Sequence, residues 1–461
     1  MIIPHDQHDQ MVGKLFVICV LVALFVSGGI TPATALVIPP LADPPSGSTL
    51  TSLSVTFTGA HTSDDLEHKL RIGTTNGGAQ IYNKTMPPNH SVTVSGLPSM
   101  GTIYVWYWTR NSSGWFVNTS TYTMNVGRIW NCAAGDTACL INAITLANAS
   151  GNPEVIQLAA GTYTFVKNLF DDALLLPQIT GNITLKGVGP DQTIITSDVP
   201  LGRESSVKTF IVEEVATLNV SGLSIVKGGL AIRNKGNVVI EQVTISKGGP
   251  GLFNEQTGTM TLKNSTVIDN GFFQGDGGGI VNKGTMEITE STIRDNGQEF
   301  YAGINNVGRM TLKNSTVADN HAESEGGGIG NLSGGWMEIS NSLIQNNDAN
   351  SGGGIDNAGD MTILRSVITG NEARIAFGNG GAILNTGALT ISRTVIANNT
   401  ASGRGGGILN FGGDLTLDRT IIAGNQAGEV GGGISHELNG LFVTEKTVVA
   451  NNTPDDCSGC P

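Results

Sequence analysis

The stretch GGGIVNKGTMEITESTIRDN, residues 277–296, holds one complete unit of the pattern that decides the fold. The next two units read GINNVGRMTLKNSTVADN at 303–320 and GGGIGNLSGGWMEISNSLIQNN at 326–347. Each unit combines a hydrophobic-x-Asn triplet, a short apolar run and a Ser/Thr-x-hydrophobic-x-x-Asn segment. Self-similarity at a period of about 25 residues indicates a protein built from stacked repeats.

Two Asn anchors recur through this region at nearly constant spacing. The first anchor ends at Asn234, Asn254, Asn282, Asn306, Asn331, Asn357, Asn385 and Asn410, with His436 in the last unit. The second anchor ends at Asn270, Asn296, Asn320, Asn347, Asn371, Asn399, Asn425 and Asn452. Three short strands per unit make one coil of a three-sided helix, which buries its apolar edge only by stacking on its neighbours. We therefore predict a parallel β-helix of about ten coils, with Asn side chains stacked at its corners.

The composition agrees with short strands separated by tight turns. The chain of 461 residues contains 64 glycines, and only 14% of its residues are charged. Its aliphatic content is too high for a disordered chain. The net charge of −13 argues against nucleic acid and anionic lipid surfaces as partners.

Residues 1–35 are predicted to be a signal peptide. Lys14 precedes the apolar run LFVICVLVALFV at 15–26, and Ala33-Thr34-Ala35 supplies a small-x-small cleavage site. The run is shorter than the roughly 20 residues that span a bilayer, so cleavage is favoured over the alternative of a retained anchor. We expect a secreted or cell-surface monomer without a stable membrane anchor after cleavage.

Four cysteines remain after cleavage: Cys132, Cys139, Cys457 and Cys460. An even number in an exported chain indicates disulfides. Pairing Cys132 with Cys139 would staple the start of the repeat domain, and pairing Cys457 with Cys460 would staple its end. The alternative is a zinc site, which requires the two distant pairs to meet.

Residues 45–126, after a linker at 36–44, are predicted to form a small β-sandwich. Apolar and polar residues alternate there in short runs broken by Gly, Pro, Asn and Ser. The segments at 91–98 and 102–110 resemble the closing strands of fibronectin-type-III-like modules, which implies an immunoglobulin-like sandwich.

One strand of this predicted sandwich has aromatic side chains on one of its two faces. Tyr104, Trp106 and Trp108 alternate with Ile103, Val105 and Tyr107, and Trp115 follows nearby. Such a stripe is more typical of sandwich core than of the alternative, a sugar-binding platform.

The repeat region, residues 127–461, resembles the pectin-lyase-like superfamily. The resemblance rests on the GGGI and Ile-x-Asn repeats and on the segment at 136–163, DTACLINAITLAN…VIQLAAGTY. That segment is similar to the cysteine-led opening motif of bacterial surface proteins such as polymorphic outer-membrane proteins, although the usual Leu-Arg-Glu-Ala reads Leu-Ile-Asn-Ala at 140–143. It implies an all-β, single-stranded, right-handed parallel β-helix, with a capping helix within 127–150 and a tail at 453–461. Lyases, hydrolases, esterases and adhesins share this fold, so it implies no single activity.

The resemblance also indicates where to look for catalytic acids, namely at outward positions of one parallel sheet. If Ile and Asn of the Ile-x-Asn strand point inward, the residue between them points outward. Asp356 is the one carboxylate at these positions, whereas glycoside hydrolysis ordinarily needs two flanking carboxyl groups. Asp356 is thus a weak catalytic candidate, and we predict a non-catalytic face.

Three acids are candidates for a metal site. Asp269, Asp295 and Asp319 occupy equivalent positions in successive units, one residue before the corner Asn. Stacked carboxylates about 4.8 Å apart repel one another unless a cation lies between them, so calcium is the functional hypothesis. The favoured interpretation is three solvated turn residues, and no other cofactor is indicated.

Loops preceding the GGGI strands place acids beside aromatic rings, a combination suited to glycan binding. The candidates are Phe272, Phe273, Asp276, Phe300, Tyr301, Glu325 and Phe377. We predict a non-catalytic, adhesin-like or glycan-binding protein whose partner is a polysaccharide or surface glycan. The competing hypotheses are a polysaccharide lyase or glycoside hydrolase and a purely structural spacer. A paired-carboxylate or Asp-plus-Arg cluster in the folded chain would favour the enzyme.

Overall fold

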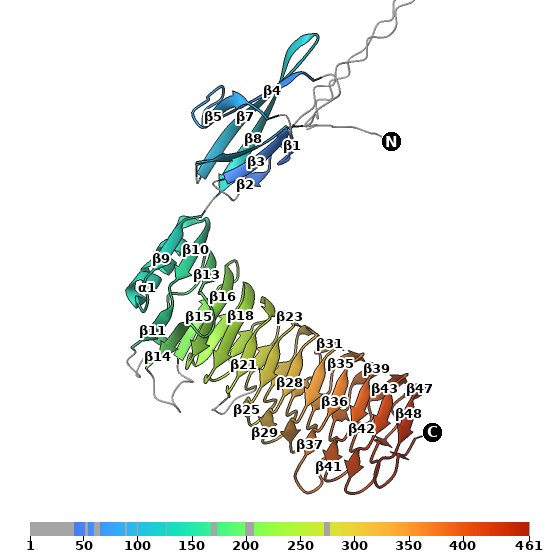
Figure 1. Cartoon of the computed structure of the whole chain (residues 1–461). Coiled ribbons are helices and arrows are strands. Elements are labelled where there is room, and N and C mark those ends of the chain that lie inside the picture. The colour runs from blue at the N-terminus through green and yellow to red at the C-terminus, as the bar shows by residue number, and fades with distance from the viewer. Residues whose placement is uncertain are drawn as a thin grey trace, which may run out of the picture.

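The computed structural model describes residues 41–50, 54–59, 65–87, 90–98, 100–125, 127–166, 173–198, 207–271 and 277–460. The predicted signal peptide and most of the predicted linker lie outside these ranges. Figure 1 shows an N-terminal β unit followed along the chain by a long stack of coils. Within the described ranges, no helix is long and apolar enough to cross a membrane.

The N-terminal unit contains two sheets that share one hydrophobic core. The first sheet has the order β1 (Leu41–Asp43), β3 (Ser54–Gly59), β6 (Ser91–Ser95). The second has the order β2 (Thr49–Leu50), β8 (Gly114–Asn125), β7 (Met100–Asn111), β4 (Glu67–Gly73), β5 (Tyr82–Thr85). Phe57 of the first sheet and Tyr122 of the second meet in this core, with ring centroids 5.8 Å apart. The strand content agrees with the prediction, and the fibronectin-type-III-like assignment stays a prediction.

The aromatic stripe of β7 does not belong to this core. Ile103, Val105 and Tyr107 are fully buried in the core, and the stripe side chains are not among its members. The stripe alternates with these core residues, so it faces outward from the five-stranded sheet. Trp106 is nevertheless only 9% exposed, whereas Tyr104 and Trp108 are half-buried, so the stripe is partly covered on the outer side of the sheet.

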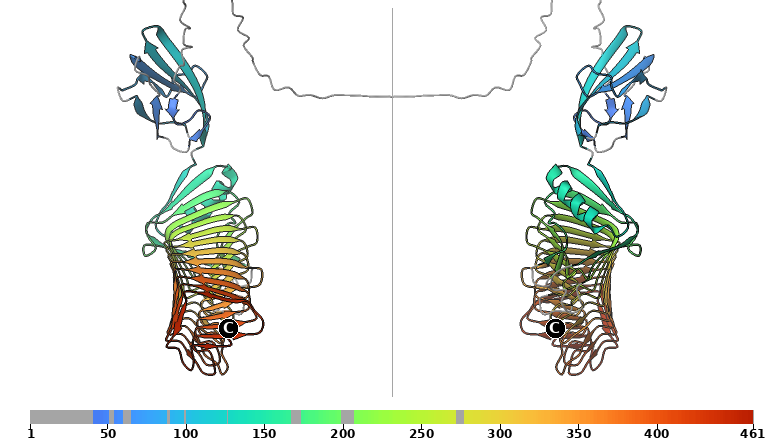
Figure 2. Two further views of the ribbon diagram at one scale, coloured as in Figure 1. Left: turned by 90° about the vertical axis from the view of Figure 1, so that its right-hand side faces the viewer. Right: turned by 90° about the vertical axis from the view of Figure 1, so that its left-hand side faces the viewer.

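The predicted capping helix is present as α1 (Thr137–Ser150). The Asp136 side chain accepts a hydrogen bond from the Cys139 backbone N–H at 2.9 Å, which begins the helix, and Gly151 ends it in a left-handed conformation. Leu140 and Ile144 bury one face of α1 against the core of the first coils. Figure 2 shows the helix lying across the first coils. The helix therefore covers the strand edge that would otherwise be exposed at this end.

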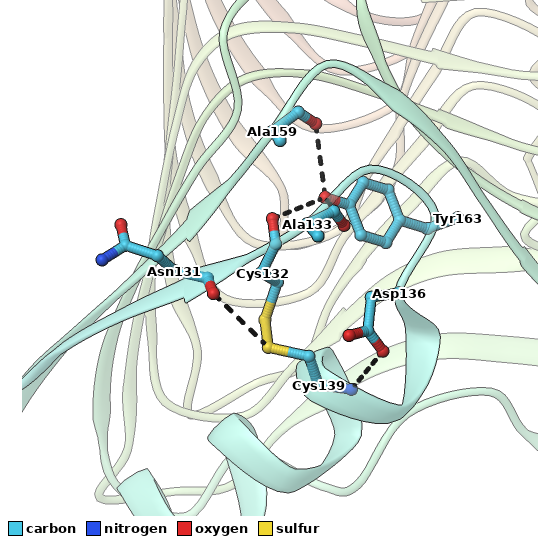
Figure 3. The surroundings of a disulfide bond; sticks show 7 residues. All are labelled: Asn131, Cys132, Ala133, Asp136, Cys139, Ala159 and Tyr163. Carbon is cyan, nitrogen blue, oxygen red and sulfur yellow. Dashed lines mark hydrogen bonds between the residues drawn. A yellow bond between two sulfur atoms is a disulfide. The ribbon is translucent and has the colours of Figure 1, made fainter.

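A disulfide between Cys132 and Cys139 joins α1 to β9 (Ile129–Cys132), as predicted. Its surroundings are ordered by Tyr163, whose hydroxyl lies 2.8 Å from the Ala133 carbonyl oxygen and 3.1 Å from that of Cys132 (Figure 3). The second predicted disulfide, Cys457–Cys460, is also present.

Twelve parallel strands form the sheet that holds the Ile-x-Asn triplets. They are β12 (Ala173–Leu174), β15 (Val207–Val212), β17 (Leu230–Asn234), β19 (Leu252–Asn254), β22 (Ile280–Asn282), β26 (Ile304–Asn306), β30 (Ile329–Asn331), β34 (Ile355–Asn357), β38 (Ile383–Asn385), β42 (Ile408–Phe411), β46 (Ile434–Glu437) and β49 (Cys457–Ser458). The stack exceeds the predicted ten coils because its first two strands, β12 and β15, and its last strand, β49, lack the Asn anchor. The all-β, parallel β-helix prediction is confirmed.

Two further rows of parallel strands complete the coil. One row contains β10 (Pro153–Leu158), β13 (Asn182–Lys186), β16 (Thr217–Val226), β18 (Asn237–Ser246), β20 (Thr259–Lys263), β23 (Thr285–Thr289), β27 (Arg309–Lys313), β31 (Trp336–Ser340), β35 (Asp360–Leu364), β39 (Ala388–Ser392), β43 (Asp414–Asp418) and β47 (Phe442–Glu445). The other contains β11 (Gly161–Phe165), β14 (Thr193–Ser197), β21 (Thr266–Ile268), β24 (Thr292–Arg294), β28 (Thr316–Ala318), β32 (Leu343–Gln345), β36 (Val367–Thr369), β40 (Val395–Ala397), β44 (Ile421–Ala423) and β48 (Val448–Ala450). Strands β16 and β18 are long enough to pair in both rows.

A fourth row of two-residue strands was not predicted. It contains β25 (Gly297–Gln298), β29 (His321–Ala322), β33 (Asp348–Ala349), β37 (Glu372–Ala373), β41 (Thr400–Ala401) and β45 (Gln426–Ala427). These strands align the loops that lead into the Ile-x-Asn triplets, so the loops of neighbouring coils are also in register.

The two Asn ladders form as predicted. In the first ladder, Asn331 is fully buried, accepts a hydrogen bond from Asn306 and donates one to Asn357, both at 2.8 Å. Other residues continue the ladders in the last coils: Asn410 bonds His436 at 2.9 Å, and Asn452 donates to Asp456 at 3.0 Å. The tail also adds β49 beside β46, so it covers part of the last coil.

Candidate functional site

On the outer face of the twelve-stranded sheet, the middle residue of the β30 triplet is a glycine, Gly330. The ring of Tyr301 lies over this glycine, since a Cβ atom added there would be only 2.1 Å from Tyr301 Cδ1. Tyr301 has a φ of 54°, a conformation that is unusual for a bulky side chain. A glycine at position 330 is therefore what lets the aromatic ring fold down onto the sheet.

Two carboxyl groups flank this ring. Asp356 is the direct partner of Gly330 in the parallel ladder, one strand further along the stack. Glu325 lies at the end of the loop before β30, where it pairs with Ser351 through an isolated bridge. The Tyr301 hydroxyl donates a hydrogen bond to Glu325 Oε2 at 3.2 Å. We call Tyr301, Glu325, Gly330 and Asp356 the Asp356 site.

The two acids of the Asp356 site lie in different environments. Asp356 is 7% exposed, whereas Glu325 is exposed to solvent. Burial, followed by the negative charge of Glu325, raises the pKa of Asp356 from 3.8 to about 7. Near neutral pH, Asp356 can thus hold a proton and donate it, and a second carboxyl group, that of Glu325, lies beside it.

Asp356 is buried because its own coil folds back over it. The outward direction of the middle triplet position is confirmed, since Ile355 and Asn357 on either side are fully buried in the helix interior. A Cβ atom at Gly352, in the glycine run just before the strand, would lie 3.0 Å from Asp356 Cβ. An outward direction therefore does not make a triplet position accessible, and several of these middle positions are buried: Val281, Asn305, Leu409 and Ser435.

The structure brings together four of the sequence-predicted candidates. Phe300 joins Tyr301, Glu325 and Asp356, with its ring centroid 6.1 Å from that of Tyr301. Phe377 lies on the loop that precedes β38 and is 73% exposed. The candidates Phe272, Phe273 and Asp276 lie outside the described residues.

The three stacked aspartates occupy a corner that demands an unusual backbone conformation. Asp269, Asp295 and Asp319 have φ values of 54°, 53° and 54°, and this position is continued in later coils by Asn346, Gly370, Asn398, Gly424 and Asn451. Asp, Asn and Gly are the residues that adopt left-handed φ most readily. Across the described ranges, no group of three or more His, Cys, Asp or Glu side chains is placed to hold a metal ion. The left-handed backbone thus accounts for Asp, Asn or Gly at this position, and calcium binding by the three aspartates stays a prediction.

Sequence reasoning missed an ionic cluster on the fourth row of strands. Asp348 Oδ2 lies 2.9 Å from His321 Nδ1 and 2.6 Å from Arg374 Nε, so three successive coils are joined. Arg374 also donates to the Ala322 carbonyl oxygen at 2.9 Å. The sequence analysis predicted no strands in this row. Without those strands, nothing in the sequence indicates that the three side chains lie beside one another on successive coils.

Comparisons with known proteins agree with the coil architecture. Residues 210–368 match the family described as "Right handed beta helix region". A search of curated proteins found no match. The identities to the solved structures that follow are too low to transfer an activity.

Three solved structures are similar to this chain. The A-module of mannuronan C-5 epimerase AlgE6 from Azotobacter vinelandii is 14% identical, with a TM-score of 0.36, over 70% of this chain and 97% of its own. A family 28 exopolygalacturonase from Yersinia enterocolitica is 9% identical, with a TM-score of 0.27, over 90% of this chain and 99% of its own. A mannuronic-acid-specific polysaccharide family 6 lyase from human gut microbiota is 10% identical, with a TM-score of 0.31, over 72% of this chain and 90% of its own. The family match over residues 210–368 and the observed coils together show that this chain has a right-handed, parallel β-helix fold.

Proposed function

We propose that the β-helix cleaves a polysaccharide by glycoside hydrolysis at the Asp356 site. The observation that supports this proposal is the meeting of a buried and an exposed carboxyl group on adjacent coils, with the Tyr301 ring folded onto the sheet beside them. Asp356 is the proton donor to the glycosidic oxygen, and Glu325 is the second carboxylate that the reaction requires.

The environments of the two acids suit these different roles. A general acid works best when its pKa is near the working pH, and burial raises the pKa of Asp356 to about 7. Glu325 is exposed to solvent and accepts a hydrogen bond from the Tyr301 hydroxyl. It can therefore activate water or stabilise positive charge on the sugar ring. Tyr301 offers that ring an aromatic surface.

This pairing favours the enzyme over the predicted non-catalytic role. The sequence argument against catalysis was that Asp356 has no second acid on its own face, and Glu325 comes instead from a loop. The substrate is expected outside the cell, because the predicted signal peptide and the two disulfides indicate an exported chain.

The test is the release of new reducing ends by the purified full chain from a panel of neutral and acidic polysaccharides. We expect Asp356→Asn and Glu325→Gln each to lower the rate by roughly 100-fold or more, the usual contribution of an acid–base group. The matched controls are Asp360→Asn and Glu323→Gln, which change exposed acids close in sequence and should leave the rate unaltered.

Two outcomes would contradict hydrolysis. Unsaturated products that depend on Asp356 would assign the same site to a lyase. Retention of a glycan without turnover, at equal strength in the wild type and in Asp356→Asn, would support the non-catalytic glycan-binding role.

A further inference from the structure

The outer face of the five-stranded sheet in the N-terminal unit combines aromatic rings with cations. Side chains directly opposite each other on antiparallel strands share one face of the sheet. Arg71 is opposite Trp106, Lys69 is opposite Trp108, and Arg110 is opposite Trp115. Three strands, β4, β7 and β8, therefore contribute to one surface, which we call the aromatic–cationic face.

The cations of this face are held over the aromatic rings. Lys69 Nζ lies 4.5 Å from the centroid of the Trp115 ring, and the Arg71 guanidinium carbon lies 5.0 Å from that of Trp108. Arg110 lies 5.6 Å from the Trp115 ring. Such cation–π contacts fix long side chains in place, so a ligand that binds them loses less conformational entropy.

The charge of the face is opposite to that of the whole protein. Glu67 is the one acid on these positions of β4, and it lies 3.8 Å from Lys69 and 3.6 Å from Arg110. Three cations and one carboxylate give the face a charge of 3 − 1 = +2, within a chain of net charge −13. A positive surface on an acidic protein attracts an anionic partner locally while the rest of the molecule repels it.

We infer that the aromatic–cationic face binds an acidic polysaccharide, with its carboxylates on the cations and its sugar rings against the exposed aromatic surface. Guanidinium groups bind carboxylates through paired hydrogen bonds, and indole rings bury the apolar faces of sugars. Trp115 is 41% exposed and is therefore accessible to a ligand. The face is separate from the Asp356 site, so this inference does not depend on the proposed hydrolysis.

The face can be altered without disturbing the fold. Its side chains are absent from the core of the unit, which is formed by residues such as Leu70, Val105 and Tyr107. Lys84 provides a matched control, because it is an exposed cation on β5 whose position opposite Leu70 directs it to the other face.

The experiment measures binding of the full chain to polygalacturonate at low salt, with the same polymer after complete methyl esterification as a neutral comparison. An Asp356→Asn background prevents cleavage of the probe. We expect Lys69→Ala/Arg71→Ala, and separately Trp115→Ala, to weaken binding about tenfold, which corresponds to loss of one charge-assisted or stacking contact. Lys84→Ala should bind as the parent does.

Binding should also weaken as salt rises, because the contacts are ionic. Equal binding of the esterified polymer, or unchanged binding by both face variants, would overturn the inference. Absence of any binding to polygalacturonate would also overturn it. Circular dichroism of each variant checks that the fold is retained.

Discussion

The corner ladders and the loop side of the twelve-stranded sheet belong to the same coils, yet they use side chains in opposite ways. At the corner, Asn306, Asn331 and Asn357 repeat the same contact from coil to coil at 2.8 Å. On the loop side, the same three coils contribute Tyr301, Glu325 and Asp356, three different side chains with different surroundings.

The difference follows from what each region must satisfy. A buried amide needs a partner in both neighbouring coils, so a ladder can be continued only by a residue that donates and accepts. The loops have no such constraint, and a departure from the repeat there changes surface chemistry without breaking the stack. Periodicity therefore identifies the scaffold, and its interruptions identify the candidate site.

The largest expected effect comes from breaking a ladder in its middle. Asn331→Ala removes the acceptor for Asn306 and the donor for Asn357, and carbonyls of Gly335 and Asp360 also lose a donor. Buried groups left unsatisfied cost about 1–3 kcal/mol each, so we expect a loss of roughly 5 kcal/mol in the free energy of unfolding. Urea unfolding followed by circular dichroism measures this loss.

The matched variant is His436→Ala at the end of the same ladder. His436 has one ladder neighbour, Asn410, rather than two, so we expect a loss of about 1–2 kcal/mol. Equal losses at Asn331 and His436 would show that the ladder does not couple the coils.

The second effect has the opposite sign and arises on the loop side. The folded chain holds the pKa of Asp356 at about 7, above its ordinary value of 3.8. The folded state thus binds the proton more tightly than the unfolded state, and stability falls as pH rises from about 4 to about 7. Each unit of pKa difference between the folded and unfolded states corresponds to about 1.36 kcal/mol. The free energy of unfolding is therefore lower above pH 7 than below pH 4 by on the order of 4 kcal/mol.

Asp356→Asn removes this loss, so it should stabilise the protein at pH 8 and change little at pH 4. Unfolding free energies of the wild type and the variant at the two pH values measure the difference. Asp360→Asn, at an exposed position, should show no such pH dependence. If Asp356→Asn destabilises the protein at pH 8, then Asp356 has a structural role, and the proposed proton donor is wrong.

The Asn anchors could be predicted from the sequence because they must repeat, whereas the partner of Asp356 could not. Glu325 approaches Asp356 only because the loop before β30 runs back over the sheet, and no periodic position encodes that path. The Tyr301 ring can lie on the sheet only because residue 330 is a glycine, and the hydrophobic-x-Asn pattern does not specify the residue at this middle position. The fourth row of strands was missed for a related reason, since two-residue strands carry too few residues for a period to appear.

The smallest effect concerns the stacked aspartates, which repeat like the ladder residues but lie at the surface side of the corner. Asp269→Asn/Asp295→Asn/Asp319→Asn keeps residues that adopt left-handed φ, so we expect the free energy of unfolding to change by less than about 0.5 kcal/mol. Thermal unfolding with and without calcium should give the same midpoint for the wild type and for the triple variant.

Asp319→Val is the informative contrast, because a β-branched residue fits left-handed φ poorly and should cost about 1–2 kcal/mol. Together the two variants separate charge from conformation at one position. A midpoint that rises with calcium in the wild type, and not in the triple variant, would instead establish a metal site there. The three aspartates would then be functional residues, like those on the loop side, even though they repeat from coil to coil as the ladder residues do.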